Sequence, residues 1–313
     1  MRHSGGIVPR YGIIDLGSNT IRLCIYETPS EKKNGITRKE IQVLLNYKIM
    51  AGLASFVKEG AITKKGIKKA INTINAHLRR ASHFDCEEIH VFATAVIRNC
   101  SNSKDAAQAI SEGCNIPVTI LSTWDEAHLG FIGANLDRHL DEGILVDIGG
   151  GSTELTIIHE EESQTSVSIP QGSLSSYSSN VCGIVPTQAE INAIRLSFID
   201  CLRESNFDLP KQDELFGIGG SIRSAAKVYG DVCNEGERTV YLLPEHLDKI
   251  LDQYKTYPDT FLHKALQTIP DRIHTFIPGC IIIREIFAIT RAKRLTVCKS
   301  GIREGYLVDR ILK

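Results

Sequence analysis

The stretch Ile14-Asp15-Leu16-Gly17-Ser18-Asn19-Thr20 has a near copy later in the chain, Val146-Asp147-Ile148-Gly149-Gly150-Gly151-Ser152-Thr153-Glu154-Leu155. In each copy an apolar run ends at an aspartate, a glycine turn follows, and a second strand-like run begins. The copies coincide apart from one added residue in the second. Because such similarity within one chain is most simply explained by duplication, the sequence predicts two homologous domains.

The segments around the two copies also follow one order. In the first half, residue patterns predict strands over 11–15, 20–27, 41–49, 88–93 and 117–121, and helices over 64–80, 104–112 and 125–136. In the second half they predict strands over 144–148, 154–159, 166–170, 215–218 and 295–298, and helices after Thr187, after Ser221 and over 302–312. The remaining helical stretch, residues 244–290, is interpreted as an insertion.

The fold class predicted by this order is α/β. Parallel β-α units place helices on both faces of a sheet, so that each half can bury its own core, and ligands then bind at the ends of the strands. We expect a first domain over residues 1–124 and a second over residues 125–313, with a ligand cleft between them. The last helix is able to pack back on the first domain.

Composition and charge exclude several classes of protein. Hydrophobic residues make up 42% of the 313 residues and charged residues 23%, which is typical of a chain with a buried core. A net charge of −1 provides no general basic field for nucleic acid. Nine cysteines without a C-x-x-C pair favour free thiols in a reducing compartment. We expect no signal peptide and no membrane-spanning run, and therefore a cytoplasmic protein without a membrane partner.

Three glycine turns have the chemistry of phosphate-binding loops. Small residues let main-chain N–H groups approach an anion closely, and hydroxyl or amide side chains add further donors. The predicted phosphate ligands are Gly17, Ser18, Asn19 and Thr20 in the first turn, Gly149, Gly150, Gly151, Ser152 and Thr153 in the second, and Gly219, Gly220 and Ser221 in the third. The third turn opens a helix, and a plain tight turn is an equal alternative for it when it is taken alone.

Each of the first two turns follows an aspartate at the end of a strand. Magnesium prefers oxygen ligands and is usually held by one or two carboxylates together with substrate phosphates. The sequence therefore predicts a Mg²⁺ site with Asp15 and Asp147 as its protein ligands.

The three loops in this order resemble the superfamily of actin, sugar kinases and heat-shock ATPases, and the full strings resemble the exopolyphosphatase and guanosine pentaphosphate phosphohydrolase family. Further matches to that family are Ala93-Thr94 with Arg98, Asp125-Glu126-Ala127, Gly217 to Ser221, and Ser300-Gly301-Ile302-Arg303-Glu304-Gly305. The resemblance spans nearly the whole chain. It implies two duplicated ribonuclease H-like (actin-like) domains, in a short form without the helical C-terminal domains of longer relatives.

The resemblance also implies roles for particular residues. Glu126 would be the general base that orients the attacking water, Glu154 would assist the water or the metal, and Arg98 would bind substrate phosphate. The implied substrate is polyphosphate or guanosine pentaphosphate, and the implied assembly is a homodimer. Without the resemblance, Glu126 could simply favour the helix dipole and Arg98 could form a surface ion pair.

Three departures from the family pattern bear on substrate preference. Lys48-Ile49-Met50-Ala51-Gly52 stands where the family often has Arg-Leu-Gly. Arg272 is followed by His274, where the family commonly has an acid, and Ser173-Leu174-Ser175 replaces a stretch that often carries an arginine.

Three functions remain to be compared. A hydrolase would use water activated by Glu126. A small-molecule kinase would need a nucleotide pocket around Gly219, and the pattern of Glu126 and Glu154 argues against it. A non-catalytic alarmone or nucleotide sensor is favoured by the departures at Met50 and His274, because binding can persist after turnover declines.

Overall fold

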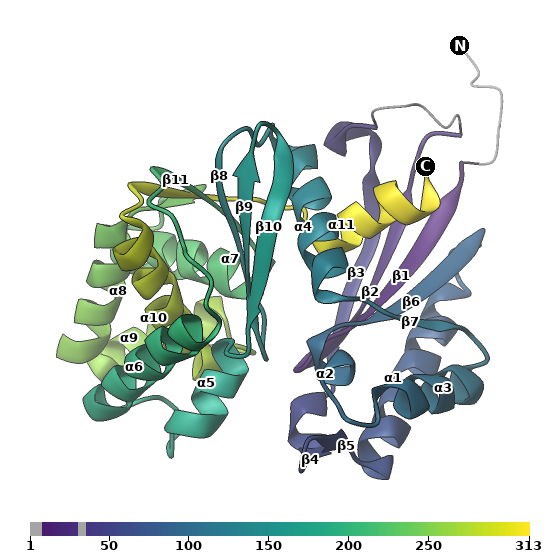
Figure 1. Ribbon diagram of the computed structural model, residues 1–313, viewed down its shortest axis with the longest axis horizontal. Coiled ribbons are helices and arrows are strands. Elements are labelled where there is room, and N and C mark those ends of the chain that lie inside the picture. The colour runs from purple at the N-terminus through teal and green to yellow at the C-terminus, as the bar shows by residue number, and fades with distance from the viewer. Residues whose placement is uncertain (1–7, 31–35) are drawn as a thin grey trace. The chain divides into compact units, whose positions relative to one another are not determined.

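The protein was analysed as a computed structural model that describes residues 8–30 and 36–313 (Figure 1). Its contacts divide the chain into two compact units. Unit 1 comprises Met1–Asp137 and Ile302–Lys313, and unit 2 comprises Arg138–Gly301. The sequence-based boundary after residue 124 differs from this division, because the helix that follows it packs against the last helix of the chain and belongs to unit 1.

Unit 1 is built on a five-stranded mixed sheet with helices on both faces. Its elements are β1 (Arg10–Leu16), β2 (Thr20–Glu27), η1 (Arg38–Glu40), β3 (Gln42–Met50), η2 (Leu53–Phe56), β4 (Val57–Lys58), β5 (Ala61–Ile62), α1 (Lys64–Ala81), β6 (Glu88–Ala93), α2 (Ala95–Arg98), α3 (Ser103–Cys114), β7 (Val118–Ile120), α4 (Thr123–Asp137), α11 (Ile302–Tyr306) and η4 (Leu307–Ile311).

Side chains alternate along β1, so that its two faces enter two separate cores. Ile14 and Leu16 belong to the core that α1 and α3 complete. Tyr11 and Ile13 belong to the core that α4 and α11 complete. The sheet of unit 1 is thus the middle layer of three.

Unit 2 is built on a six-stranded mixed sheet. Its elements are β8 (Gly143–Ile148), β9 (Thr153–His159), β10 (Glu162–Ile169), α5 (Ser173–Asn180), α6 (Gln188–Glu204), β11 (Glu214–Ile218), α7 (Gly219–Val228), η3 (Tyr229–Cys233), β12 (Tyr241–Leu242), α8 (Pro244–Thr256), α9 (Pro258–Thr268), α10 (Ile273–Thr290) and β13 (Arg294–Val297). The predicted helical insertion corresponds to α8, α9 and α10.

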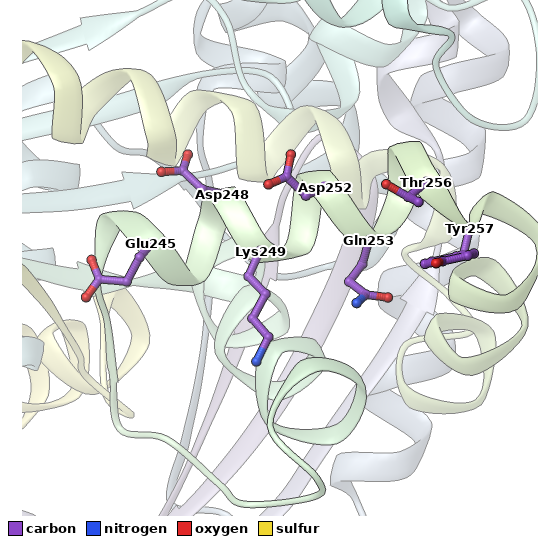
Figure 2. Close-up of a pocket in the computed structure, with 7 residues that line it drawn as sticks. All are labelled: Glu245, Asp248, Lys249, Asp252, Gln253, Thr256 and Tyr257. Carbon is purple, nitrogen blue, oxygen red and sulfur yellow. The ribbon is translucent and has the colours of Figure 1, made fainter.

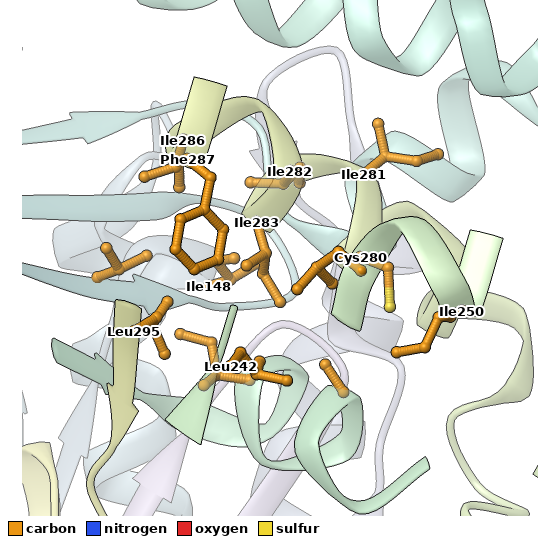
Figure 3. Packing of buried hydrophobic residues seen from close by; sticks show 14 of the residues in the cluster. Ile148, Leu242, Ile250, Cys280, Ile281, Ile282, Ile283, Ile286, Phe287 and Leu295 are labelled. Atoms are coloured by element: carbon orange, nitrogen blue, oxygen red, sulfur yellow. The ribbon is translucent and has the colours of Figure 1, made fainter. Parts of the chain in front are cut away.

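The main core of unit 2 is organised around α10. Figure 3 shows Ile282, Ile283 and Phe287 of this helix packed with Ile148 and Leu295 from the sheet, and all five side chains are at most 2% exposed. By length and composition α10 could cross a membrane, which corrects the expectation that no stretch of the chain is apolar enough. Since 67% of the helix is buried inside unit 2, its role in the core accounts for its apolar composition.

The two sheets share one strand order. In unit 1 the order is β3-β2-β1-β6-β7, with antiparallel pairing among the first three strands and parallel pairing from β1 to β7. In unit 2 the order is β10-β9-β8-β11-β13 with the same directions, and β12 is added antiparallel at one edge. The predicted duplication of an α/β domain is therefore confirmed.

Helix α5 was not predicted from the sequence. Its residues, SLSSYSSN, include several serines, which have a weak intrinsic preference for helices. Local hydrogen bonds compensate for this, because the side chain of Ser175 accepts from the N–H of Gly172 at 2.8 Å. The first N–H groups of the helix also donate to main-chain carbonyls of the preceding glycine turn.

Three contacts attach the C-terminal helix α11 to unit 1. Arg303 Nη1 donates to Asp15 Oδ2 at 3.1 Å, and the hydroxyl of Tyr26 donates to Glu304 Oε1 at 2.7 Å. Gly305 lies so close to the carbonyl oxygen of Leu129 that a Cβ atom would overlap it. The first strand and the last helix of the chain are thus joined by a buried ion pair.

Replacing Arg303 tests the weight of this pair. In Arg303→Met, Asp15 becomes a buried carboxylate without its cation, so we expect the free energy of unfolding to fall by about 3–5 kcal/mol. The control is Arg310→Met, which removes the ion pair with Asp125 from an arginine whose side chain is 43% exposed, and it should cost less than about 1 kcal/mol. Both losses are measured by denaturant unfolding, and equal losses would show that the buried pair contributes nothing special.

Candidate active site

The predicted site residues of each unit lie at one edge of its sheet. In unit 1, Asp15 lies near the end of β1, and the neighbouring parallel strands β6 and β7 lead into α2 with Arg98 and α4 with Glu126. In unit 2, Asp147 lies near the end of β8, and the neighbouring strand β11 leads into α7 at Gly219. Since parallel strands share their carboxyl edge, each unit gathers its polar groups where α/β sheets bind ligands.

The first glycine turn exposes its N–H groups because its carbonyl groups are held by the protein. The N–H of Gly17 donates to Thr20 O at 3.0 Å and closes the turn. Main-chain N–H groups within residues 51–54 donate to Asn19 O, twice at 2.9 Å, and to Ser18 O at 2.9 Å. The N–H groups of Ser18 and Asn19 have no hydrogen-bond partner within residues 8–30 and 36–313. They can therefore donate to a bound anion.

The second glycine turn has the same construction. The N–H of Gly149 donates to Ser152 O at 2.9 Å. Main-chain N–H groups of residues 173–175, at the start of α5, donate to Gly149 O at 3.0 Å and to Gly150 O at 2.8 and 2.9 Å. The N–H groups of Gly150 and Gly151 have no partner in the part of the chain that the structure describes. A second set of donors is thus available to an anion.

The two turns have equal length, which corrects the alignment with one added residue. Each turn is closed by a hydrogen bond from a glycine to the third residue after it, 17 to 20 and 149 to 152. Across the hairpins, Asp15 is paired with Arg22, and Asp147 is paired with Glu154. Glu154 therefore occupies in unit 2 the position of Arg22 in unit 1, and Arg22 becomes a site residue that the sequence pattern did not reveal.

Asp15 is held as a buried partner of two arginines. Its side chain is 16% exposed, and the partner side chain of Arg303 is 15% exposed. Burial raises the pKa of Asp15 above its ordinary value, and the positive charges of Arg303 and Arg22 oppose this rise. Arg303 occupies Oδ2, while Oδ1 has no protein hydrogen bond within the described residues, so one carboxylate oxygen can bind a cation.

Asp147 lies against the third glycine turn. Gly219 has a φ of +86°, and a Cβ atom on it would overlap Oδ1 of Asp147. The described residues contain no group of three acidic, histidine or cysteine side chains that could hold a metal. Asp15 and Asp147 fit Mg²⁺ as single carboxylate ligands, one in each unit, because this ion commonly completes its shell with water and substrate phosphates.

Glu126 and Arg98 form a buried ion pair. Arg98 Nη1 donates to Glu126 Oε2 and also to Leu121 O at 3.2 Å. The side chains of Glu126 and Arg98 are only 9% and 14% exposed. The pair is therefore not a surface pair, and the adjacent guanidinium favours the ionised carboxylate that a general base requires.

Several predicted hydroxyl donors are used inside the protein. The hydroxyl of Ser152 donates to Glu154 Oε1 at 2.6 Å, and that of Ser168 donates to the same oxygen at 2.8 Å. The hydroxyls of Thr153 and Ser221 donate to main-chain carbonyl oxygens at 2.7 and 3.0 Å. Main-chain N–H groups, rather than these hydroxyls, are thus the donors that unit 2 offers to a phosphate.

Arg272 is a second site residue to which the sequence analysis assigned no role. It precedes α10, and its guanidinium lies so close to Gly220 that a Cβ atom there would overlap Nη2. The half-buried side chain forms no ion pair or hydrogen bond with any described residue, and burial lowers its pKa. A guanidinium beside the first N–H groups of α7 provides a site for an anion.

Two surface hollows lie away from these residues. One, of about 290 Å³, is lined by residues of α8 and by Tyr257, among them Glu245, Asp248 and Asp252 (Figure 2). The other, of about 300 Å³, is lined by residues 88–91, Pro117, Thr119 and Tyr306. Neither contains a predicted site residue.

Gly219 and Gly236 offer a matched test of the contact with Asp147. Both have a left-handed φ, +86° and +87°, but nothing lies within 4 Å of a Cβ atom on Gly236. Gly236→Ala should therefore lower the free energy of unfolding by about 1–2 kcal/mol from backbone strain alone. Gly219→Ala should cost about 1–3 kcal/mol more, because the carboxylate of Asp147 must move. Equal losses in denaturant unfolding would contradict this close packing.

Comparisons with known proteins agree with the geometry. The model of the Ppx/GppA phosphatase family matches residues 31–313. A Haemophilus influenzae protein provisionally named an exopolyphosphatase is 22% identical over 98% of this chain and 92% of its own length. Exopolyphosphatase 1 of Mycobacterium tuberculosis is 28% identical over 52% of this chain, which spans about half (46%) of that relative.

Solved structures show the same fold. The Aquifex aeolicus member of the Ppx/GppA family superposes with a TM-score of 0.76 at 23% identity, over 97% of this chain and 98% of that one. An exopolyphosphatase from Cytophaga hutchinsonii superposes with a TM-score of 0.77 at 19% identity, over 96% of each chain. With an actin-like fold, duplicated glycine turns and a family match over most of its length, the chain belongs to the Ppx/GppA phosphatase family.

Proposed function

We propose that the protein is a Mg²⁺-dependent phosphohydrolase that removes the terminal phosphate from inorganic polyphosphate, from the 5′ end of guanosine pentaphosphate, or from both. The observation that carries this proposal is the pair of equal glycine turns, whose carbonyl groups are bound by the protein and whose N–H groups are available. A substrate with several linked phosphates can use both turns at once, whereas a single phosphate needs only one.

Binding in this proposal relies on main-chain donors and on one arginine. The N–H groups of Ser18 and Asn19 in unit 1, and of Gly150 and Gly151 in unit 2, would each hold phosphate oxygens. Arg272, beside the start of α7, would add a charged donor. This binding set depends little on side-chain hydroxyls and suits a chain of repeating phosphates.

Catalysis would depend on the carboxylate of Glu126. A water held by Glu126 attacks the terminal phosphorus, the carboxylate accepts a proton from that water, and the bond from phosphorus to the bridging oxygen breaks. The products are inorganic phosphate and a chain shortened by one unit. Arg98 acts as a positioning residue, because its ion pair keeps the carboxylate of Glu126 ionised and in one orientation. Mg²⁺ held by Asp15 and Asp147 would neutralise the charge of the phosphate oxygens.

A non-catalytic sensor of the same ligands is the second candidate. The departures at Met50 and His274 favour it, since both positions lie in segments beside the glycine turns. Such a sensor would bind condensed phosphates without turnover. A homodimer remains a prediction for either function.

Phosphate release separates the two candidates. Purified protein with Mg²⁺ should release phosphate from polyphosphate or guanosine pentaphosphate. Glu126→Gln should lower kcat by at least about 100-fold while substrate binding is largely retained, because the carboxylate acts on water. Glu112→Gln, which makes the same change on the exposed face of α3, serves as the control. A wild-type protein that releases phosphate from neither substrate would end the hydrolase proposal.

The metal assignment is tested at Asp147. Asp147→Asn should raise the Mg²⁺ concentration for half-maximal rate by at least about tenfold, since one anionic ligand is lost. Asp213→Asn, at a surface ion pair with Lys293, is the matched control. Superimposable Mg²⁺ titrations of Asp147→Asn and the wild type would remove Asp147 from the metal site.

A further inference from the structure

His274 lies in the first turn of α10, two residues after Arg272. Its ring contacts Tyr177 of α5 edge-on, with 5.2 Å between ring centroids and an interplanar angle of 69°. Helix α5 is the element whose first N–H groups hold the second glycine turn. His274 thus connects the segment that carries Arg272 with the segment that supports the turn.

The charge of Arg272 is not balanced by the protein. Within residues 8–30 and 36–313 its side chain pairs with no carboxylate, and the adjacent Asp271 is no exception. The guanidinium is nevertheless half-buried and packs on Gly220. A half-buried cation is costly unless an anion compensates it, so this arrangement is suited to a negatively charged ligand.

His274 itself is half-buried and uncharged at neutral pH. Burial lowers the pKa of His274 from its ordinary value, and the nearby charge of Arg272 lowers it further. The ring therefore fills space against Tyr177 without adding a negative charge next to the guanidinium. A carboxylate at position 274 would instead offer Arg272 an internal partner.

We propose that His274 is a specificity-determining residue, which leaves the guanidinium of Arg272 unpaired within the protein and so available to the phosphates of a condensed phosphate ligand. The inference rests on the proposed function, because it concerns the same anion site. It assigns to His274 an effect on affinity and not a step in the reaction.

Binding of imidodiphosphate, whose P–N–P bridge resists hydrolysis, provides the test. Calorimetry at fixed ionic strength with Mg²⁺ should show about tenfold weaker binding for His274→Glu than for the wild type, the size expected when a partly buried cation gains an internal partner. His274→Gln, which stays uncharged, should bind much more tightly than His274→Glu. His263→Glu, the same change at an exposed position of α9, should remain within about twofold of the wild type.

A double-mutant comparison links the effect to Arg272. In an Arg272→Gln background, His274→Glu should weaken binding by less than about threefold, because the guanidinium with which the carboxylate would pair is absent. An undiminished loss in that background, or equal binding by His274→Glu and the wild type, would overturn the inference alone. Failure of the wild type to bind imidodiphosphate would overturn the proposed function as well, and thermal unfolding of each variant identifies a variant that has not folded.

Discussion

Hydrogen bonds to the carbonyl groups of the two glycine turns are the constraint on which the rest of the structure depends. A tight turn contains donors and acceptors in equal number, and a phosphate can be bound only where the donors are collected and the acceptors are removed. Residues 51–54 and 173–175 bind the acceptors in their respective units. Both supporting segments follow the third strand of their sheet, so the duplication includes the means of support as well as the turns. This also explains why the departures from the family pattern in these segments are tolerated, because the support comes from main-chain N–H groups.

The charged groups around the turns are arranged by their degree of pairing. Asp15 is paired with Arg303, and Glu126 is paired with Arg98, and these side chains are largely buried. Arg272 has no such partner among the described residues. Paired carboxylates are fixed in orientation and kept ionised, which suits a metal ligand and a base, whereas an unpaired guanidinium suits a ligand phosphate. The division between paired and unpaired groups follows the roles proposed for them.

Much of the fold could be predicted from the sequence, because strands with alternating side chains and helices with apolar faces leave strong local patterns. The duplication, the strand order around Asp15 and Asp147, and the family were confirmed. Helix α5 was missed because its serines are stabilised by contacts with a turn that is distant in the sequence. The site was predicted less completely for the same reason. The ion pair of Arg303 with Asp15 joins opposite ends of the chain, and no local pattern indicates that the hydroxyls of Thr153 and Ser221 are used internally.

The central claim is that both turns serve a single cation and a single phosphate chain. Anomalous diffraction from crystals grown with Mn²⁺, as a substitute for Mg²⁺, and with imidodiphosphate tests it most directly. The account predicts one Mn²⁺ peak near the carboxylates of both Asp15 and Asp147, with phosphate oxygens at the N–H groups of both turns. Separate metal peaks at the two aspartates, or a ligand bound away from either turn, would contradict the account.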